Sequence, residues 1–334
     1  MGRLFLLLIV AVGLAPGTWV RTTDWGEPDL RQILAVESLP VHRTSLGGAA
    51  EVAGAWRLSS PNANFSGYSA LLAMGDGTLL ALSDHARSLR FSPPDAVRQQ
   101  PVRIDYLNPS VTAEKRLLDL ESATRDPATG RLWVAYELGN HIERYDRAFR
   151  QTGRVRPVEM RRWPSNDGPE AMVRLADGRF VVLSEGSPRW FAADLPGLLF
   201  PGDPLEGGKP RPFRFRGPED FLPVDMAQLP DGRVLILLRA VRWGLPPRFE
   251  SKLVVTDPAA IAPGQLWPWR EVAHLAEPLP MDNYEGLAIE PADDGRLVLW
   301  LISDDNRVRF QRTLLLKLLW RPNEKARGSP RAPR

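Results

Sequence analysis

Residues 169–185 read PEAMVRLADGRFVVLSE, and this stretch decides the fold. Glu170 stands just before a short apolar run, Asp177 and Gly178 form a turn dipeptide, and a β-prone run (FVVL) follows before Glu185. Two such runs joined by an Asp-Gly pair are typical of a β-hairpin. The stretch therefore predicts two antiparallel strands with a tight turn between them.

Four other stretches share this plan and recur at regular intervals along the chain. They are YSALLAMGDGTLLALSD (68–84), LESATRDPATGRLWVAYE (120–137), VDMAQLPDGRVLILLR (224–239) and YEGLAIEPADDGRLVLWLISDD (284–305). When the five hairpins are aligned at their starts, they share an anchor position that is occupied by Ser69, Glu121, Glu170, Asp225 and Glu285. Successive anchors are 52, 49, 55 and 60 residues apart. This period is typical of four-stranded propeller blades.

We therefore predict an all-β protein that folds as a β-propeller of five blades, closed by an N-terminal strand. Residues 313–320 (TLLLKLLW) supply only a third strand after the last hairpin, so residues 52–58 (VAGAWRL), which alternate in polarity, are expected to complete that blade. Residues 33–41 have no place in this count, and six blades stay open as an alternative. A β-sandwich with similar hairpins is the alternative fold, but it does not predict an acid at matched positions of successive hairpins.

The sequence between the hairpins supplies the outer strands of each blade. Third strands are expected at residues 142–145 and 253–256. Fourth strands are expected at residues 102–107, 155–160, 213–216 and 271–275. These runs are short and β-prone, as strands of an all-β fold usually are.

The two ends of the chain differ in composition from the middle. Arg3 precedes an uncharged apolar run, so residues 1–20 are expected to be a signal peptide or an uncleaved N-terminal anchor. The expected location is therefore outside the cytoplasm, periplasmic or secreted, with membrane contact only through an uncleaved N-terminal segment. Residues 33–320 are expected to form the propeller domain, and residues 321–334 a disordered basic tail.

Composition excludes several kinds of chemistry. The chain has no cysteine, so disulfides, thiolate nucleophiles and thiolate metal sites are absent. Its 43 basic and 40 acidic residues are interspersed rather than gathered on a basic stretch, which argues against nucleic-acid binding. The expected partner is a small-molecule ester or phosphoester, and the expected state is a monomer.

The anchor positions should converge on one channel, because the inner strand of every blade lines the axis of a propeller. A second ring, where the second strands end, consists of Asp84, Glu137, Glu185, Arg239 and Asp304. Neighbouring carboxylates raise one another's pKa, so these rings need a cation, arginine partners or backbone donors. Oxygen ligands of this kind suit calcium or magnesium rather than zinc, and the expected ligands of such an ion are Glu121, Glu170, Asp225, Glu285 and Asp304. The alternative is that the acids join blade to blade through hydrogen bonds.

Four residues are candidate catalytic groups. Glu170 and Glu285 could activate water as pore carboxylates. His85 and His141 each follow a second strand, near the expected pore mouth, and could act as general bases. Ser69 is a weaker candidate for a nucleophile, because the residues around it lack the second glycine of a Gly-x-Ser-x-Gly elbow.

Several motifs resemble those of the phytase-like family, whose full description is "esterase-like activity of phytase". The blade motifs are Phe65-Ser66-Gly67-Tyr68-Ser69-Ala70-Leu71, Asp119-Leu120-Glu121, Gly168-Pro169-Glu170-Ala171 and Asn283-Tyr284-Glu285-Gly286-Leu287. The C-terminal signature is Ser303-Asp304-Asp305-Asn306 followed by Gln311-Arg312-Thr313-Leu314-Leu315. The resemblance covers residues 50 to 319 and implies a propeller related to phosphate- or ester-hydrolysing ones, with calcium at an acidic pore. Ser66, Ser122 and Asp225 depart from the family's pattern.

Two functions follow from these observations. The first is metal-assisted hydrolysis of phosphate or carboxylic esters at the acidic pore of an exported propeller. The alternative is a non-catalytic exported propeller that binds a ligand or a partner, with pore acids that are purely structural.

Overall fold

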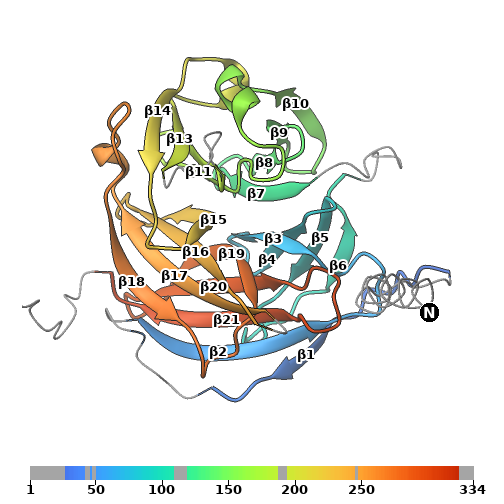
Figure 1. Cartoon of the computed structure of the whole chain (residues 1–334). Helices are drawn as coiled ribbons and strands as arrows, with labels where there is room; N and C mark the ends of the chain where they lie inside the picture. Colours follow the sequence, from blue (N-terminus) through green and yellow to red (C-terminus); the bar gives the residue numbers. More distant parts are fainter. Residues whose placement is uncertain are drawn as a thin grey trace, which may run out of the picture.

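The computed structural model describes residues 27–41, 46, 50–108, 119–186, 194–244 and 247–322. Most regular structure in these residues is β-strand, and the strands form five antiparallel sheets arranged in a ring (Figure 1). This arrangement confirms the predicted propeller with five blades. The expected N-terminal segment, residues 1–20, and most of the expected tail lie outside the described residues. Within the described ranges, no helix is long and apolar enough to cross a membrane.

The first four blades each contain four strands in sequence order, with the first strand next to the axis. Blade I consists of β3 (Tyr68–Ala73), β4 (Leu79–Ser83), β5 (Arg87–Phe91) and β6 (Arg103–Tyr106). Blade II consists of β7 (Leu120–Arg125), β8 (Leu132–Tyr136), β9 (His141–Tyr145) and β10 (Gln151–Val155). Blade III consists of β11 (Ala171–Arg174), β12 (Phe180–Leu183), β13 (Leu195–Phe200) and β14 (Arg211–Phe215). Blade IV consists of β15 (Leu222–Gln228), β16 (Val234–Arg242), β17 (Arg248–Thr256) and β18 (Trp269–Leu275).

Blade V joins the two ends of the propeller. Its strands, from the axis outward, are β19 (Asn283–Pro291), β20 (Leu297–Asp304), β21 (Thr313–Trp320), β2 (Ala50–Ser59) and β1 (Ala35–Ser38). β2 pairs with β21 in antiparallel register from Ala50 opposite Trp320 to Leu58 opposite Thr313, and the two lie side by side in Figure 1. The predicted closure is therefore confirmed. Residues 33–41, which had no place in a five-blade count, contribute the outer strand β1 instead of a sixth blade.

Glycines at the hairpin turns explain why the first two strands of each blade reverse so tightly. Every turn has a glycine in the left-handed region, with φ between 71° and 90°: Gly77, Gly130, Gly178, Gly232 and Gly295. L-residues other than glycine rarely adopt this conformation. In the three Asp-Gly-Arg turns, the aspartate also accepts a hydrogen bond from the arginine backbone N–H, at 3.1 Å each. The repeated sequence signal therefore corresponds to a repeated turn.

One predicted outer strand is wrong. Residues 155–160 were expected as the fourth strand of blade II, but β10 ends at Val155 and a 3₁₀ helix, η2 (Val158–Arg162), follows. Pro157 lies between them with φ −56°, and proline cannot donate to a strand ladder. The other short helices are η3 (Pro204–Glu206) and η4 (Pro258–Ala260).

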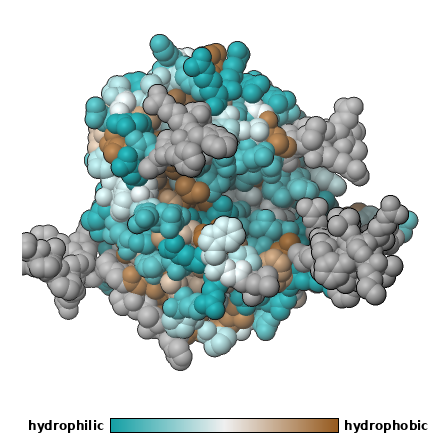
Figure 2. Space-filling model, viewed as in Figure 1, coloured by the Kyte–Doolittle hydropathy of each residue, from teal (hydrophilic) through white to brown (hydrophobic). Residues whose placement is uncertain are grey.

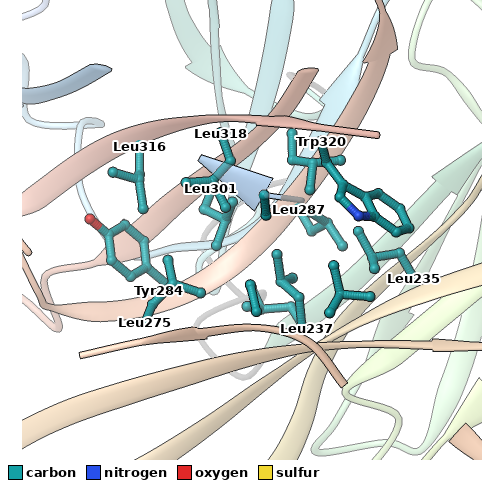
Figure 3. Close-up of a cluster of buried hydrophobic side chains, with 14 of the residues drawn as sticks. Leu235, Leu237, Leu275, Tyr284, Leu287, Leu301, Leu316, Leu318 and Trp320 are labelled. Carbon is teal, nitrogen blue, oxygen red and sulfur yellow. The ribbon is translucent and has the colours of Figure 1, made fainter. Parts of the chain in front are cut away.

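The hydrophobic core lies between the blades rather than in one central mass. Figure 3 shows one such interface, where Leu235, Leu237 and Leu275 of blade IV point toward side chains of blade V that include Tyr284 and Trp320. By contrast, the face of the molecule seen in Figure 2 is largely hydrophilic, with small separate hydrophobic patches. The inner strands of adjacent blades contact one another around the whole ring, so they surround the axis of the propeller, which is called the channel here.

Candidate active site at the acidic end of the channel

Irregular pairing at the start of the inner strands sets the direction of the anchor side chains. Ser69, Glu121 and Glu285 are each skipped in the ladder between the first two strands of their blade. A residue left out in this way is a β-bulge, which re-aims its side chain relative to the sheet. Glu170 stands just before β11, at the matching place in blade III. The anchor residues of blades II, III and V are close enough for the charges of Glu170 and Glu285 to raise the pKa of Glu121.

Blade IV is offset by one residue from this pattern. Here the residue skipped in the ladder is Val224, while Asp225 pairs with Leu237. The Asp225 carboxylate is only 2% exposed and accepts backbone N–H bonds from Leu287 at 2.7 Å and Met226 at 2.8 Å. Burial raises the pKa of Asp225, and these backbone donors oppose the rise. Asp225 thus has the geometry of the blade-to-blade hydrogen bonds that the sequence offered as the alternative to a metal ligand.

Arg239 compensates the acids on one side of the channel. Its Nη1 donates to Asn283 Oδ1 at 2.9 Å and to Glu285 Oε1, and its Nη2 donates to Glu185 Oε1 at 2.8 Å. Burial works against the charge on Arg239, but the carboxylates around it, above all Glu285, outweigh burial and raise the pKa of the guanidinium. The single arginine of the second ring therefore links blades III, IV and V.

A second group of acids lies on blade II and has a different environment. Asp119, Glu121 and Glu137 each offer a carboxylate oxygen, and the three oxygens lie within 4.8 Å of one another. Burial raises the pKa of Glu121 well above its ordinary value, and the charge of Glu170 adds to the effect. Among the described residues, no ion pair involves this group, whereas Arg239 forms ion pairs with Glu185 and Glu285. The group is therefore the part of the ring that could hold a cation.

Glu137 and Glu170 lie close together across the interface between blades II and III, and each affects the pKa of the other. Glu137 also accepts the Gly168 N–H at 3.2 Å. Burial, opposed by this hydrogen bond, raises the pKa of Glu137 to about 7. Burial and the charges of Glu185 and Glu137 raise the pKa of Glu170 well above its ordinary value. Two adjacent carboxyl groups, one protonated and one ionised, can supply an acid and a base at neutral pH.

Asp304 and His85 lie at the blade V and blade I side of the ring. Asp304 is 5% exposed and accepts the Asn306 N–H at 2.7 Å. Burial raises the pKa of Asp304 well above its ordinary value, and Glu285 adds to the effect. His85 Nδ1 lies 2.9 Å from Asp84 Oδ1, and this hydrogen bond raises the pKa of the half-exposed imidazole. An imidazole oriented by a carboxylate has the arrangement of a general base.

His141 lies elsewhere, inside blade II. Its side chain is 2% exposed and stacks on Tyr136, with ring centroids 4.8 Å apart. Its Nε2 is 3.5 Å from Glu143 Oε1, and burial lowers the pKa of the imidazole. Tyr136 belongs to the hydrophobic cluster between blades I and II. The structure therefore places His141 in an interior packing position, not at the channel mouth that the sequence predicted.

The C-terminal signature closes the ring. Asp305 Oδ1 accepts the Ser66 hydroxyl at 2.6 Å, and its Oδ2 accepts the Thr313 hydroxyl at 2.9 Å. Asp305 therefore ties the loop before β3 to the start of β21, across the junction of blades I and V. The sequence motif is explained by this structural contact.

Sequence reasoning missed two members of the acidic group as candidate ligands. In the sequence, Asp119 stands out only as part of the Asp-Leu-Glu motif, and Glu137 only as a member of the second ring. The position of Glu137 directly after β8 is the sequence signal for this residue. The last residue of β8, Tyr136, pairs with Leu120 at the start of β7, so Glu137 lies near Glu121. Asp119 is adjacent because its C=O accepts the Glu137 N–H at 2.8 Å.

The raised carboxyl pKa values predict how stability depends on pH in the absence of metal. The pKa values of Glu137 and Glu285 rise from 4.5 to about 7. Between these limits the native state binds more protons than the unfolded state, so the free energy of unfolding should fall as pH rises. We expect the melting temperature in chelator to drop by several degrees between pH 5 and pH 7.5, measured by calorimetry. A flat or rising curve would mean that these carboxylates are already compensated.

Comparison with known proteins gives a family but no curated relative. A family model described as "Phytase-like: Esterase-like activity of phytase" matches residues 63–307. No curated protein matches the chain.

Similar solved structures have low sequence identity to this chain. An α-L-arabinofuranosidase of Podospora anserina in complex with cellotriose is 13% identical, over 76% of this chain and 92% of its own, with a TM-score of 0.47. A luciferin-regenerating enzyme is 11% identical, over 86% of this chain and 97% of its own, with a TM-score of 0.44. A nidogen/laminin complex chain is 10% identical, over 80% of this chain and 88% of its own, with a TM-score of 0.42. Such identities carry no functional argument.

Proposed function

Since the chain belongs to the phytase-like family, we propose that it is an exported propeller that hydrolyses phosphate or carboxylic esters at the acidic end of its channel, with calcium bound there. The observation that carries the proposal is the pairing of two carboxyl arrangements. Three acidic oxygens converge within 4.8 Å, and one of the three residues, Glu137, lies close to Glu170, whose pKa is also raised. The first arrangement suits a hard cation, and the second suits proton transfer.

The converging oxygens fit calcium in chemistry and in spacing. Calcium takes oxygen ligands at about 2.3–2.6 Å, so two oxygens on opposite sides of the ion lie roughly 5 Å apart. The oxygens of Asp119, Glu121 and Glu137 lie within this limit. These three residues would hold the ion, which supplies Lewis-acid polarisation of the ester when it is bound.

The protein's own acids carry the proton transfers of the proposed reaction. Glu285 has a pKa of about 7, and in the described residues its hydrogen bonds from Arg239 and Asn283 both go to Oε1. The other oxygen takes a proton from water as the water oxygen bonds to phosphorus or to the acyl carbon. Glu170, in its protonated form, gives a proton to the leaving oxygen as the ester bond breaks. His85, held by Asp84, is a second base at the rim.

Loss of either catalytic carboxyl should remove activity without removing the fold. We expect Glu170→Gln and Glu285→Gln to lower kcat by about 10²- to 10⁴-fold, the usual contribution of general acid–base catalysis. The measurement is hydrolysis of an aryl phosphate and an aryl ester by the purified full chain, with calcium and with chelator.

Ser69→Ala is the matched control, because Ser69 occupies the same bulge position without a carboxyl. Its activity should stay within a few-fold of the unchanged protein. If Ser69→Ala alone abolished ester hydrolysis, a serine nucleophile would replace the proposed mechanism.

Metal analysis and melting temperature test the cation separately from catalysis. A ligand that binds only the native state stabilises it by mass action, so calcium should raise the melting temperature and chelator should lower it. Glu121→Gln should reduce the calcium shift. No shift at millimolar calcium would contradict the site.

The alternative function is an exported propeller that binds a ligand or a partner without catalysis. It is favoured by Arg239 and Asp225, which show that part of the acidic ring has structural partners. A protein that binds no calcium and hydrolyses neither substrate would support this function.

A further inference from the structure

A cavity lies at the opposite end of the channel from the acids. It has a volume of about 530 Å³ and is lined where the five inner strands lead into their hairpin turns. Its apolar lining includes Leu72, Ala73, Ala227, Ala288 and Ile289. Small-molecule sites are typically about 300–1,000 Å³, mostly apolar, with a few placed polar groups. The cavity has the size and the lining of such a site.

The arginines at this end differ in whether they have a carboxylate partner. The turn arginines Arg179, Arg233 and Arg296 each pair with the aspartate of their own turn, at 2.6–2.7 Å. Arg174, which lines the cavity, lies 3.6 Å from Asp126. The charges of these four arginines are therefore matched within the protein.

Arg125, which also lines the cavity, is different. Within the described part of the chain it has no ion pair, and its hydrogen bond is a single donation from Nη1 to the Ala73 C=O at 2.6 Å. Burial lowers the pKa of this half-buried guanidinium. A guanidinium has five N–H donors, so most of the Arg125 donors have no hydrogen-bond partner among the described residues. The charges of Asp76 and Asp126 partly offset the effect of burial, but neither carboxylate forms an ion pair with Arg125, so an anion in the cavity would stabilise this cation.

We infer that this cavity binds a small organic carboxylate, with the carboxylate on Arg125 and a hydrocarbon body against the apolar lining. A guanidinium binds a carboxylate through paired N–H donors, which are among the stronger hydrogen bonds in proteins. The lining around Leu72 and Ile289 favours a ligand that buries apolar surface over a hydrated inorganic anion. The site is independent of the proposed hydrolysis, because it lies at the other end of the channel.

Calorimetric titration of the full chain with octanoate and with 1-octanol tests the inference. Octanoate should bind saturably at one site, and octanol should bind at least about tenfold more weakly, since it lacks the charge that Arg125 recognises. Arg125→Gln should weaken octanoate binding by about tenfold and leave octanol unchanged. Arg233→Gln is the control, because Arg233 lies at the same end, is paired with Asp231, and does not line the cavity.

Three results would overturn the inference: no saturable octanoate binding, equal octanoate affinity in the unchanged protein and in Arg125→Gln, or equal affinity for octanoate and octanol. If Arg125→Gln does not fold, Ala227→Phe serves instead, because a ring at this half-buried lining position should block both probes. A folded Ala227→Phe that still binds octanoate would also overturn it. Chelator and Glu170→Gln should leave octanoate binding unchanged, which separates this site from the proposed active site.

Discussion

A chain that lacks residues 1–60 should aggregate instead of folding. This truncation removes β2, which pairs with β21 along the whole length of blade V. It also removes the buried side chains of Val52, Trp56 and Leu58. Each large side chain contributes about 1.5–3 kcal/mol through burial, against a net stability of about 5–15 kcal/mol for a typical domain. The loss would also leave β21 with an unpaired edge, which is a template for association.

Removal of residues 1–32 is the matched control. It leaves β1 and β2 intact, so the shortened protein should stay soluble and melt cooperatively. Solubility, size-exclusion elution and calorimetry of the two truncated chains provide the comparison. A soluble, cooperatively melting 61–334 chain would show that the pairing of β2 with β21 is dispensable.

Arg239→Gln should be the most destabilising single substitution in the channel. Arg239 is largely buried and bonded to Glu185 and Glu285, and its removal leaves their carboxylates without a positive partner. Breaking a buried ion pair by removing one partner typically costs about 3–5 kcal/mol. We expect a loss of this size at pH 8, measured by denaturant unfolding. The loss should be smaller at pH 5, because Glu285, with a pKa of about 7, is then protonated.

Two further variants separate this electrostatic effect from a packing effect. Adding Glu285→Gln to Arg239→Gln should recover part of the lost stability, since the uncompensated charge is then removed. Arg233→Gln breaks an exposed pair with Asp231 and should cost only about 0–1 kcal/mol. Equal losses at pH 5 and pH 8, with no recovery in the double variant, would mean that Arg239 acts through packing alone.

The fold could be predicted from the sequence because every level of the repeat agrees. Asp-Gly turns, β-prone runs and a period near fifty residues all indicate four-stranded blades, and the leftover N-terminal strand indicates closure. The failure at residues 155–160 has a local cause, since Pro157 interrupts a run that is otherwise β-prone. Outer strands are held by few neighbours, so a single proline decides where such a strand ends.

The candidate site was harder to predict, because it depends on register. In blade IV the residue skipped in the ladder is Val224, one position before the predicted anchor Asp225. Sequence spacing alone does not reveal where a β-bulge lies. Alignment on the second-ring position, which is Arg239 in blade IV, gives the correct offset, because Val224, Ser69 and Glu170 each precede that position by 15 residues. The contact between Glu137 and Glu170 joins different blades, so it follows only from the way the blades pack.

The skipped residue at the start of an inner strand has an evolutionary consequence. Because it is left out of the ladder, the flanking residues keep their alternation toward the neighbouring blades whatever side chain it carries. The chain already shows this tolerance, since the same place holds Ser69, Glu121, Val224 and Glu285. The side chain at this end of the channel can therefore be substituted in one blade at a time during evolution, without a change in the apolar interfaces between the blades.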